Sequence, residues 1–196
     1  MTIDMTRHQG DNGLPLIECC DTRLQKYRVR TDFQPYVDPE TEEQRGVTFI
    51  ETEFPYKPTI AEVKTFVIGV IDAQTDEKIL NGYEWTVLHG DDSGAHAGET
   101  VKVWLSDENQ GNFKEAHRLA SIDASRIIPV RFKISEDEGK KAVYETFHSF
   151  EELNAFYLGA FAYIKGLLDE GWQKKDSFDW SEYEQALNPE TEHEGV

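Results

Sequence analysis

The segment from residue 149 to about residue 170 constrains the fold most, because it combines a helix start signal with a long apolar stripe. In Ser149-Phe150-Glu151-Glu152 the serine hydroxyl and the Glu152 carboxylate can accept hydrogen bonds from the free amide groups at a helix start. Apolar residues then recur every three or four positions: Leu153, Phe156, Tyr157, Ala160, Phe161, Ile164, Leu167 and Leu168. Such a stripe buries one face of a helix. The sequence predicts the main core helix here, ending at Gly171.

Strand-type segments come in pairs before this helix. The three pairs are 27–33 with 47–54, 83–88 with 101–105, and 127–134 with 142–147. Each pair predicts an antiparallel hairpin. Capping signals predict further helices from Thr59 to about Leu80 and from Ser106 to about Ala124, and a short helical turn is predicted from Trp180 to Leu187. Hairpins that alternate with three helices indicate the α+β class rather than a parallel, doubly wound sheet.

The predicted elements divide the chain into four parts. In residues 1–26 the apolar residues show no sustained helical or strand periodicity. We therefore expect a flexible N-terminal arm that a partner could order. Residues 27–58 form an N-terminal β-hairpin region, and residues 59–187 form the α+β domain. Residues 188–196 form an acidic tail.

Charge and composition restrict the partners. The net charge of −18 repels nucleic-acid backbones and anionic lipid, so we expect no direct nucleic-acid binding and no membrane association. The 11 Phe, 8 Tyr and 4 Trp residues exclude a disordered acidic chain, because they supply a core. No apolar run approaches the roughly 20 residues that cross a bilayer. These features predict a cytoplasmic protein.

We expect no catalytic residues, no metal site and no cofactor. The sequence lacks the common phosphate-binding, dinucleotide-binding, zinc-protease and serine-hydrolase motifs. Cys19 and Cys20 are adjacent, so a disulfide between them would be strained, and they cannot build a zinc site alone. His117 and His148 are expected to be surface or capping residues.

One loop could hold a divalent cation through His89, Asp91, Asp92 and His96, which fall within eight residues. The same residue types are common at an exposed hairpin tip, where they turn the chain and remain solvated. We favour the hairpin tip and regard the four residues as candidate protein-binding residues.

A second candidate protein-binding set follows the main helix. Trp172 and Trp180 flank Lys174 and Lys175, and large aromatic rings often supply interface hot spots. Packing over the end of the helix is the alternative for this set. Trp104 ends a strand and is predicted to lie in the core.

Four stretches carry a resemblance to a known family: Ile71–Trp85, Val103–Gln110, Phe147–Tyr157 and Gly171–Asp176. Their order resembles that of an uncharacterised domain found in phage and prophage proteins, and the likeness covers roughly residues 55–180. The family is associated with tail, tail-fibre and fibre-assembly proteins and has no assigned catalytic residues, so no site is inherited. This sequence differs from the family pattern in a polar insert near residues 89–100 and in its N-terminal arm.

The resemblance implies a non-enzymatic, phage tail-associated protein, either a virion component or an assembly factor. Its partner would be a tail or fibre protein, with self-association into a homo-oligomer as a further option, and its location would be the virion or the bacterial host cytoplasm. Two alternatives stay open. One is an acidic inhibitor that mimics DNA to occupy a host nucleic-acid-binding protein, and the other is a small hydrolase with an unfamiliar Asp/Glu/His site.

Overall fold

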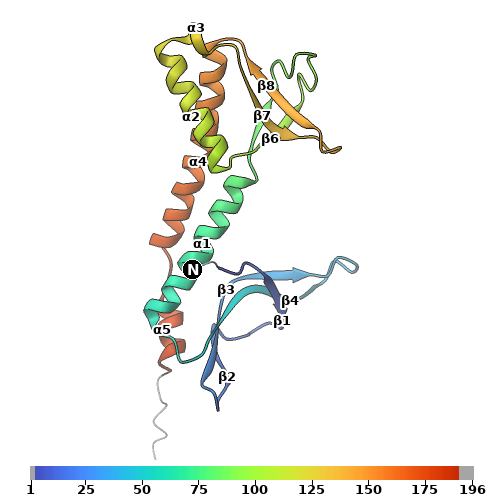
Figure 1. Ribbon diagram of the computed structural model, residues 1–196. Coiled ribbons are helices and arrows are strands. Elements are labelled where there is room, and N and C mark those ends of the chain that lie inside the picture. The colour runs from blue at the N-terminus through green and yellow to red at the C-terminus, as the bar shows by residue number, and fades with distance from the viewer. Residues whose placement is uncertain (1–2, 190–196) are drawn as a thin grey trace, which may run out of the picture. The chain divides into compact units, whose positions relative to one another are not determined.

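A computed structural model describes residues 3–189 and has the predicted α+β fold (Figure 1). The strands within this range are β1 (Arg7–Gly10), β2 (Ile17–Asp21), β3 (Lys26–Val37), β4 (Gln44–Phe54), β5 (Tyr83–Thr86), β6 (Thr100–Val103), β7 (Val130–Glu136) and β8 (Ala142–Phe147). The helices are α1 (Ile60–Leu80), α2 (Asp107–Ile122), α3 (Ala124–Ile127), α4 (Phe150–Asp176) and α5 (Ser181–Leu187). No helix between residues 3 and 189 combines the length and apolar character needed to cross a membrane.

The chain divides into two compact units. Among the described residues, the first unit comprises residues 3–74 and 173–189, and the second unit comprises residues 75–172. The divisions fall inside α1 and α4, whereas the sequence suggested boundaries at residues 26, 58 and 187. A helix that is continuous across a boundary has no break in its local pattern, so the sequence carries no signal there. Most of the predicted acidic tail, residues 190–196, lies outside the described residues.

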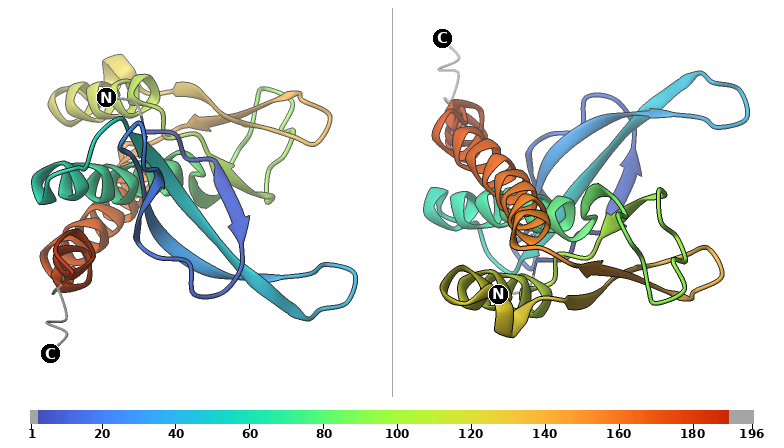
Figure 2. Two further views of the ribbon diagram at one scale, coloured as in Figure 1. Left: turned by 90° about the horizontal axis from the view of Figure 1, so that it is seen from below. Right: turned by 90° about the horizontal axis from the view of Figure 1, so that it is seen from above.

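The first unit contains a four-stranded antiparallel sheet in the order β1-β4-β3-β2. The central strands β3 and β4 form the predicted first hairpin and run side by side to the loop that joins them (Figure 2). Apolar residues of the sheet, of α1 and of α5 form one core, which includes Val29, Ile50, Val63, Phe66, Val67, Val70, Tyr183 and Leu187.

The N-terminal residues differ from the expected flexible arm, because β1 pairs with β4 and β2 pairs with β3. These strands have only four and five residues, too few to show a period in the sequence. Long-range side-chain contacts also hold them. Arg30 is buried on β3, and its guanidinium donates to Glu18 at 2.6 Å and to the Pro15 carbonyl at 3.0 Å.

The second unit contains the two-stranded sheets β5-β6 and β7-β8, with the predicted hairpin pairing. Side chains of α2, α4 and both hairpins share a core that includes Ile134, Phe147, Leu153 and Phe156. Trp104 is 38% exposed, so its predicted place in the core is wrong. The ammonium of Lys133 lies 4.9 Å from the centre of its ring instead.

Helix α4 continues past its predicted end at Gly171. A Cβ atom on this buried glycine would lie 2.7 Å from Oγ1 of Thr75 on α1. Gly171 therefore allows two helices to pack closely and does not end the helix. The sequence pattern cannot separate these two roles of a glycine, because the neighbouring helix lies far away along the chain.

Candidate functional site

The candidate site is the loop of residues 87–99, which connects β5 to β6 and carries four of the predicted binding residues. Glu145 of β8 lies beneath the start of this loop and is completely buried. Both of its carboxylate oxygens accept hydrogen bonds from N–H groups. The donors are the Trp85 indole at 2.9 Å and the backbone amides of Leu88 at 2.6 Å, His89 at 3.0 Å, Gly90 at 3.4 Å and Thr146 at 3.1 Å.

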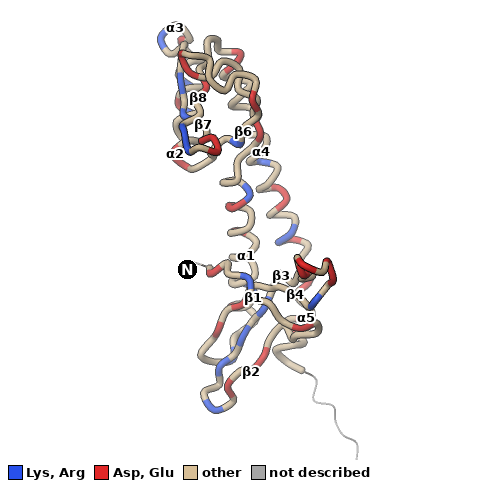
Figure 3. The backbone as a smooth tube through the Cα atoms, turned by 90° about the vertical axis from the view of Figure 1, so that its right-hand side faces the viewer, with Lys and Arg blue, Asp and Glu red and all other residues tan. Residues whose placement is uncertain are grey.

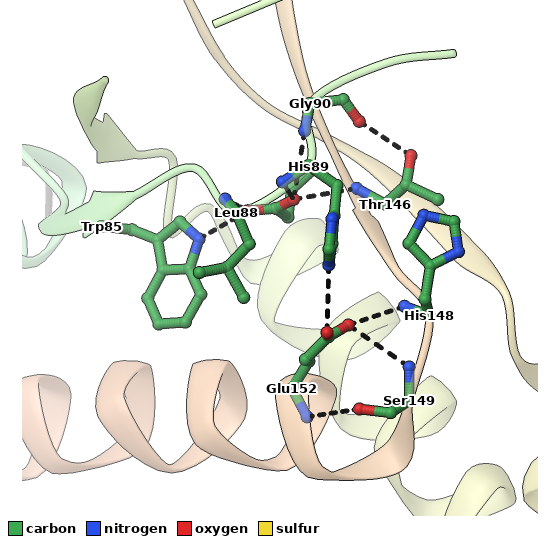
Figure 4. A network of polar contacts seen from close by, with 9 residues as sticks. Trp85, Leu88, His89, Gly90, Thr146, His148, Ser149 and Glu152 are labelled. Atoms are coloured by element: carbon green, nitrogen blue, oxygen red, sulfur yellow. Dashed lines mark hydrogen bonds and ion pairs between the residues drawn. The ribbon is translucent and has the colours of Figure 1, made fainter. Parts of the chain in front are cut away.

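Three consecutive backbone amides of the loop therefore point at one carboxylate. An ionised carboxylate loses its hydration when it is buried, and oriented N–H dipoles compensate for that loss. The Thr146 hydroxyl adds a hydrogen bond of 2.8 Å to the Gly90 carbonyl (Figure 4). The start of the loop is thus fixed to β8.

Glu145 also affects a neighbouring side chain. Burial, and secondarily the charge of Glu145, raises the pKa of the Tyr83 hydroxyl, which donates to the Phe156 carbonyl at 3.0 Å.

A second carboxylate, Glu152, fixes the same loop to the N-terminus of α4. Its side chain contacts Nε2 of His89 at 3.0 Å and accepts hydrogen bonds from the backbone amides of His148 at 2.8 Å and Ser149 at 3.3 Å (Figure 4). The Ser149 hydroxyl accepts from the Glu152 amide at 3.2 Å, which confirms the predicted capping box. The box therefore both starts α4 and holds the loop.

The environment of Glu152 lowers the pKa of its carboxyl group. Desolvation is the largest single influence and raises the pKa, but the hydrogen bonds from His89, His148 and Ser149, together with the charge of His89, outweigh it. A carboxyl group with a lowered folded-state pKa stabilises the fold above its unfolded-state pKa, and this contribution is lost as the pH falls through the folded-state value.

We therefore expect the Glu152→Gln variant to be less stable than the wild type near neutral pH. The difference should shrink as the pH falls from the ordinary carboxyl pKa of 4.5 toward the lowered folded-state value, because the protonated wild-type carboxyl then resembles the amide. Urea unfolding at a series of pH values would measure the free energy of unfolding of both proteins. The exposed neighbour Glu151→Gln is the matched control. A difference that stays constant across this range would contradict the assignment.

The remaining candidate residues of the loop each have a separate contact. Asp91 accepts from the Ser93 amide at 2.8 Å and shapes the turn, Asp92 pairs with Arg131 at 3.1 Å, and Nδ1 of His96 lies 2.9 Å from Glu99. The four predicted residues do not converge on one point. Between residues 3 and 189, no group of three or more His, Cys, Asp or Glu residues is arranged to hold a metal ion.

The second predicted set is divided between the units. Trp172 belongs to the second unit and is 52% exposed, whereas Lys174, Lys175 and Trp180 belong to the first unit. Lys175 pairs with Asp72 at 2.7 Å, and Lys174 is exposed. Trp180 is half-buried, and its ring centre lies 4.4 Å from that of Phe178. The packing alternative therefore describes Trp180, and Trp172 keeps a free aromatic surface.

Two further histidines considered in the sequence, His117 and His148, also have contacts that fit structural roles. His117 stacks on Tyr157 with ring centres 4.3 Å apart, and its Nε2 lies 2.8 Å from Oδ1 of Asn154. His148 is exposed, and its ring lies edge-on to His89 at 4.7 Å.

Sequence reasoning missed Glu145, although a signal exists. In β8 every second residue is buried, and Glu145 stands between the buried residues Val143 and Phe147. A carboxylate at an inward position of a strand needs donors, and this requirement marks it as a structural or functional centre. A comparison of the chain with family models, curated proteins and solved structures gives no match.

Proposed function

We propose that this protein is a non-enzymatic binding protein associated with a phage tail, and that it holds a tail or fibre protein through the loop of residues 87–99. One observation carries the binding role: the start of the loop is fixed by Glu145 and Glu152, whereas Asp92, Ser93, Gly94, Ala97 and Gly98 at its tip are exposed. A loop that is already ordered loses little conformational entropy when it binds. The resemblance over residues 55–180 supplies the phage setting.

The chemistry of the polar groups supports binding over hydrolysis. A general base must reach its substrate, but Glu145 is completely buried and occupied by five N–H donors. Glu152 is occupied by His89 and by the start of α4. The carboxylates in this site therefore shape the loop.

The distribution of charge favours a tail or fibre partner over the DNA-mimic alternative. Asp and Glu residues lie on helices, strands and loops of both units, and Lys and Arg residues lie among them (Figure 3). Several carboxylates are paired within the fold, as in Arg28–Glu53 at 2.9 Å and Lys165–Asp169 at 2.6 Å. A mimic of the DNA backbone needs unpaired carboxylates in a regular row.

A pull-down from phage-infected or prophage-induced cells tests the proposal. The wild type should retain a tail or fibre protein, and the double variant Asp92→Lys/Ala97→Arg should lose about tenfold or more of that affinity, as expected for about 1.4 kcal/mol of lost contact. Both residues are exposed at the loop tip, and within residues 3–189 the only ion pair lost is the surface pair of Asp92 with Arg131, so the fold should be unaffected.

The control variant is Glu138→Lys in the exposed turn between β7 and β8, which reverses a charge outside the loop as Asp92→Lys does within it. It should bind like the wild type. Equal binding by the loop variant would contradict the role of the loop. Salt-sensitive capture of a host nuclease or DNA-binding protein, in place of a tail protein, would support the inhibitor alternative.

A further inference from the structure

A second surface of the second unit has the properties of a peptide-binding groove. Two adjoining hollows of about 300 and 480 Å³ lie along α4 and share Gln110 of α2 and Ile164 of α4 in their walls. Helices α2 and α4 lie side by side in this unit (Figure 1), and the ring centres of His117 and Tyr157 are 4.3 Å apart. Because the hollows share walls, they form one groove.

The wall that α4 contributes to the groove is apolar. On the α4 side its wall consists of Tyr157, Phe161, Ile164 and Leu168, which recur at helical spacing on one face. Phe161 is 54% exposed, and Leu80 on the α1 side is 58% exposed. From residue 157 to residue 168 the helix rises about 16 Å, which matches about three turns of a second helix. Exposed apolar surface of this kind is typical of interaction sites.

The charged residues in the wall differ between the two ends. The hollow next to α1 contains two carboxylates, Asp76 and Asp107, and the hollow next to Tyr157 contains one cation, Lys114. Among the ion pairs of residues 3–189, none includes any of these three side chains. The groove therefore offers an acidic end and a basic end to a partner.

We propose that this groove binds an amphipathic α-helix of another protein. The helix presents apolar residues at positions i, i+3 or i+4, and i+7 to the α4 wall, as in other helix-in-groove complexes. Lys or Arg residues at one end of the helix pair with Asp76 and Asp107, and Asp or Glu residues at its other end pair with Lys114. This site is separate from the loop of residues 87–99 and does not depend on the phage setting.

Selection from a displayed peptide library tests the proposal on the full chain. Each peptide has an alanine-rich helical frame of about four turns, with randomised apolar positions on one face and randomised charged positions at both ends. Selected peptides should share the apolar spacing and carry Lys or Arg at one end only. Their dissociation constants should rise about tenfold or more with Phe161→Ser, which removes an apolar contact.

A charge exchange tests the direction of the helix. The variant Asp76→Lys/Asp107→Asn should weaken the selected peptides, and peptides with Glu in place of the basic residues should regain binding. Glu77→Lys is the matched control, because Glu77 is exposed on α1 and does not line the groove. The loop variant Asp92→Lys/Ala97→Arg should bind the peptides like the wild type, so failure of the loop proposal is separately visible.

Three results would overturn this inference. The first is selection without a helical apolar pattern or without the charge asymmetry. The second is peptide binding that Phe161→Ser leaves unchanged while thermal unfolding shows the variant to be folded. The third is self-association of the wild type in sedimentation that Phe161→Ser abolishes, since the occupant would then be a second copy of this chain.

Discussion

The Glu145→Gln variant should be less stable than the wild type by about 3 kcal/mol, because two or more N–H groups that point at this buried side chain lose their acceptor. One carboxylate oxygen accepts from Trp85 and Leu88, and the other accepts from His89, Gly90 and Thr146. Whichever oxygen the amide NH₂ replaces, at least two donors then face another donor. The side-chain volume is unchanged, so no cavity contributes to the loss.

Urea unfolding followed by tryptophan fluorescence would measure this change. Amide hydrogen exchange at Leu88, His89 and Gly90 should accelerate as well, since the carboxylate that holds these amides is lost. The control is Glu84→Gln, an exposed position on β5, which should change the stability by less than about 0.5 kcal/mol. Unchanged exchange at the three amides would contradict the role of Glu145. The variant should also lose partner binding although every residue of the loop tip is intact.

The Phe156→Ala variant should lose about 3–5 kcal/mol of unfolding free energy, the range for removing a buried aromatic ring from a core. Phe156 of α4 is completely buried. Its ring centre lies within 6 Å of four other aromatic rings: Phe147 at 4.9 Å, Phe113 at 5.0 Å, Trp85 at 5.1 Å and Tyr83 at 5.8 Å. The substitution removes contacts with α2, β5 and β8 together, so the core of the second unit cannot collapse around the cavity.

Phe161→Ala is the matched control on the same helix. Its side chain is 54% exposed, so this variant should lose about 1 kcal/mol or less. Urea unfolding of the three proteins under one set of conditions gives the comparison. Equal losses of unfolding free energy in Phe156→Ala and Phe161→Ala would show that the buried face of α4 is assigned wrongly. If the Phe161→Ala variant folds, substitutions of Phe161 can also be used to test peptide binding in the groove.

Helix starts and hairpins could be predicted from the sequence because their signals are local. The capping residues Thr59, Ser106 and Ser149 each stand one residue before a helix of the structure. A capping hydrogen bond joins groups within one helical turn, and hairpin patterns repeat every two residues. Each signal can therefore be recognised in a short segment of the sequence.

The N-terminal strands and the role of Gly171 could not be predicted, because each depends on a distant partner. Residues 7–10 become a strand by pairing with residues 47–50. Gly171 packs against Thr75, although these two residues lie near opposite ends of the sequence of the second unit. Trp104 is exposed for a related reason, since alternation identifies two faces of a strand but does not say which one the rest of the chain covers.

The sequence by itself determined the α+β class, the three hairpins, the starts of the main helices and the position of His89, Asp91, Asp92 and His96 on one polar loop. Only the tertiary structure decided what holds that loop in place. The donors Trp85, Leu88, His89 and Gly90 precede Glu145 by 55 to 60 residues, and they meet its carboxylate only after β5 and β8 have entered the same core. A buried charge is stable only with donors around it, and for Glu145 most of those donors come from a distant part of the chain.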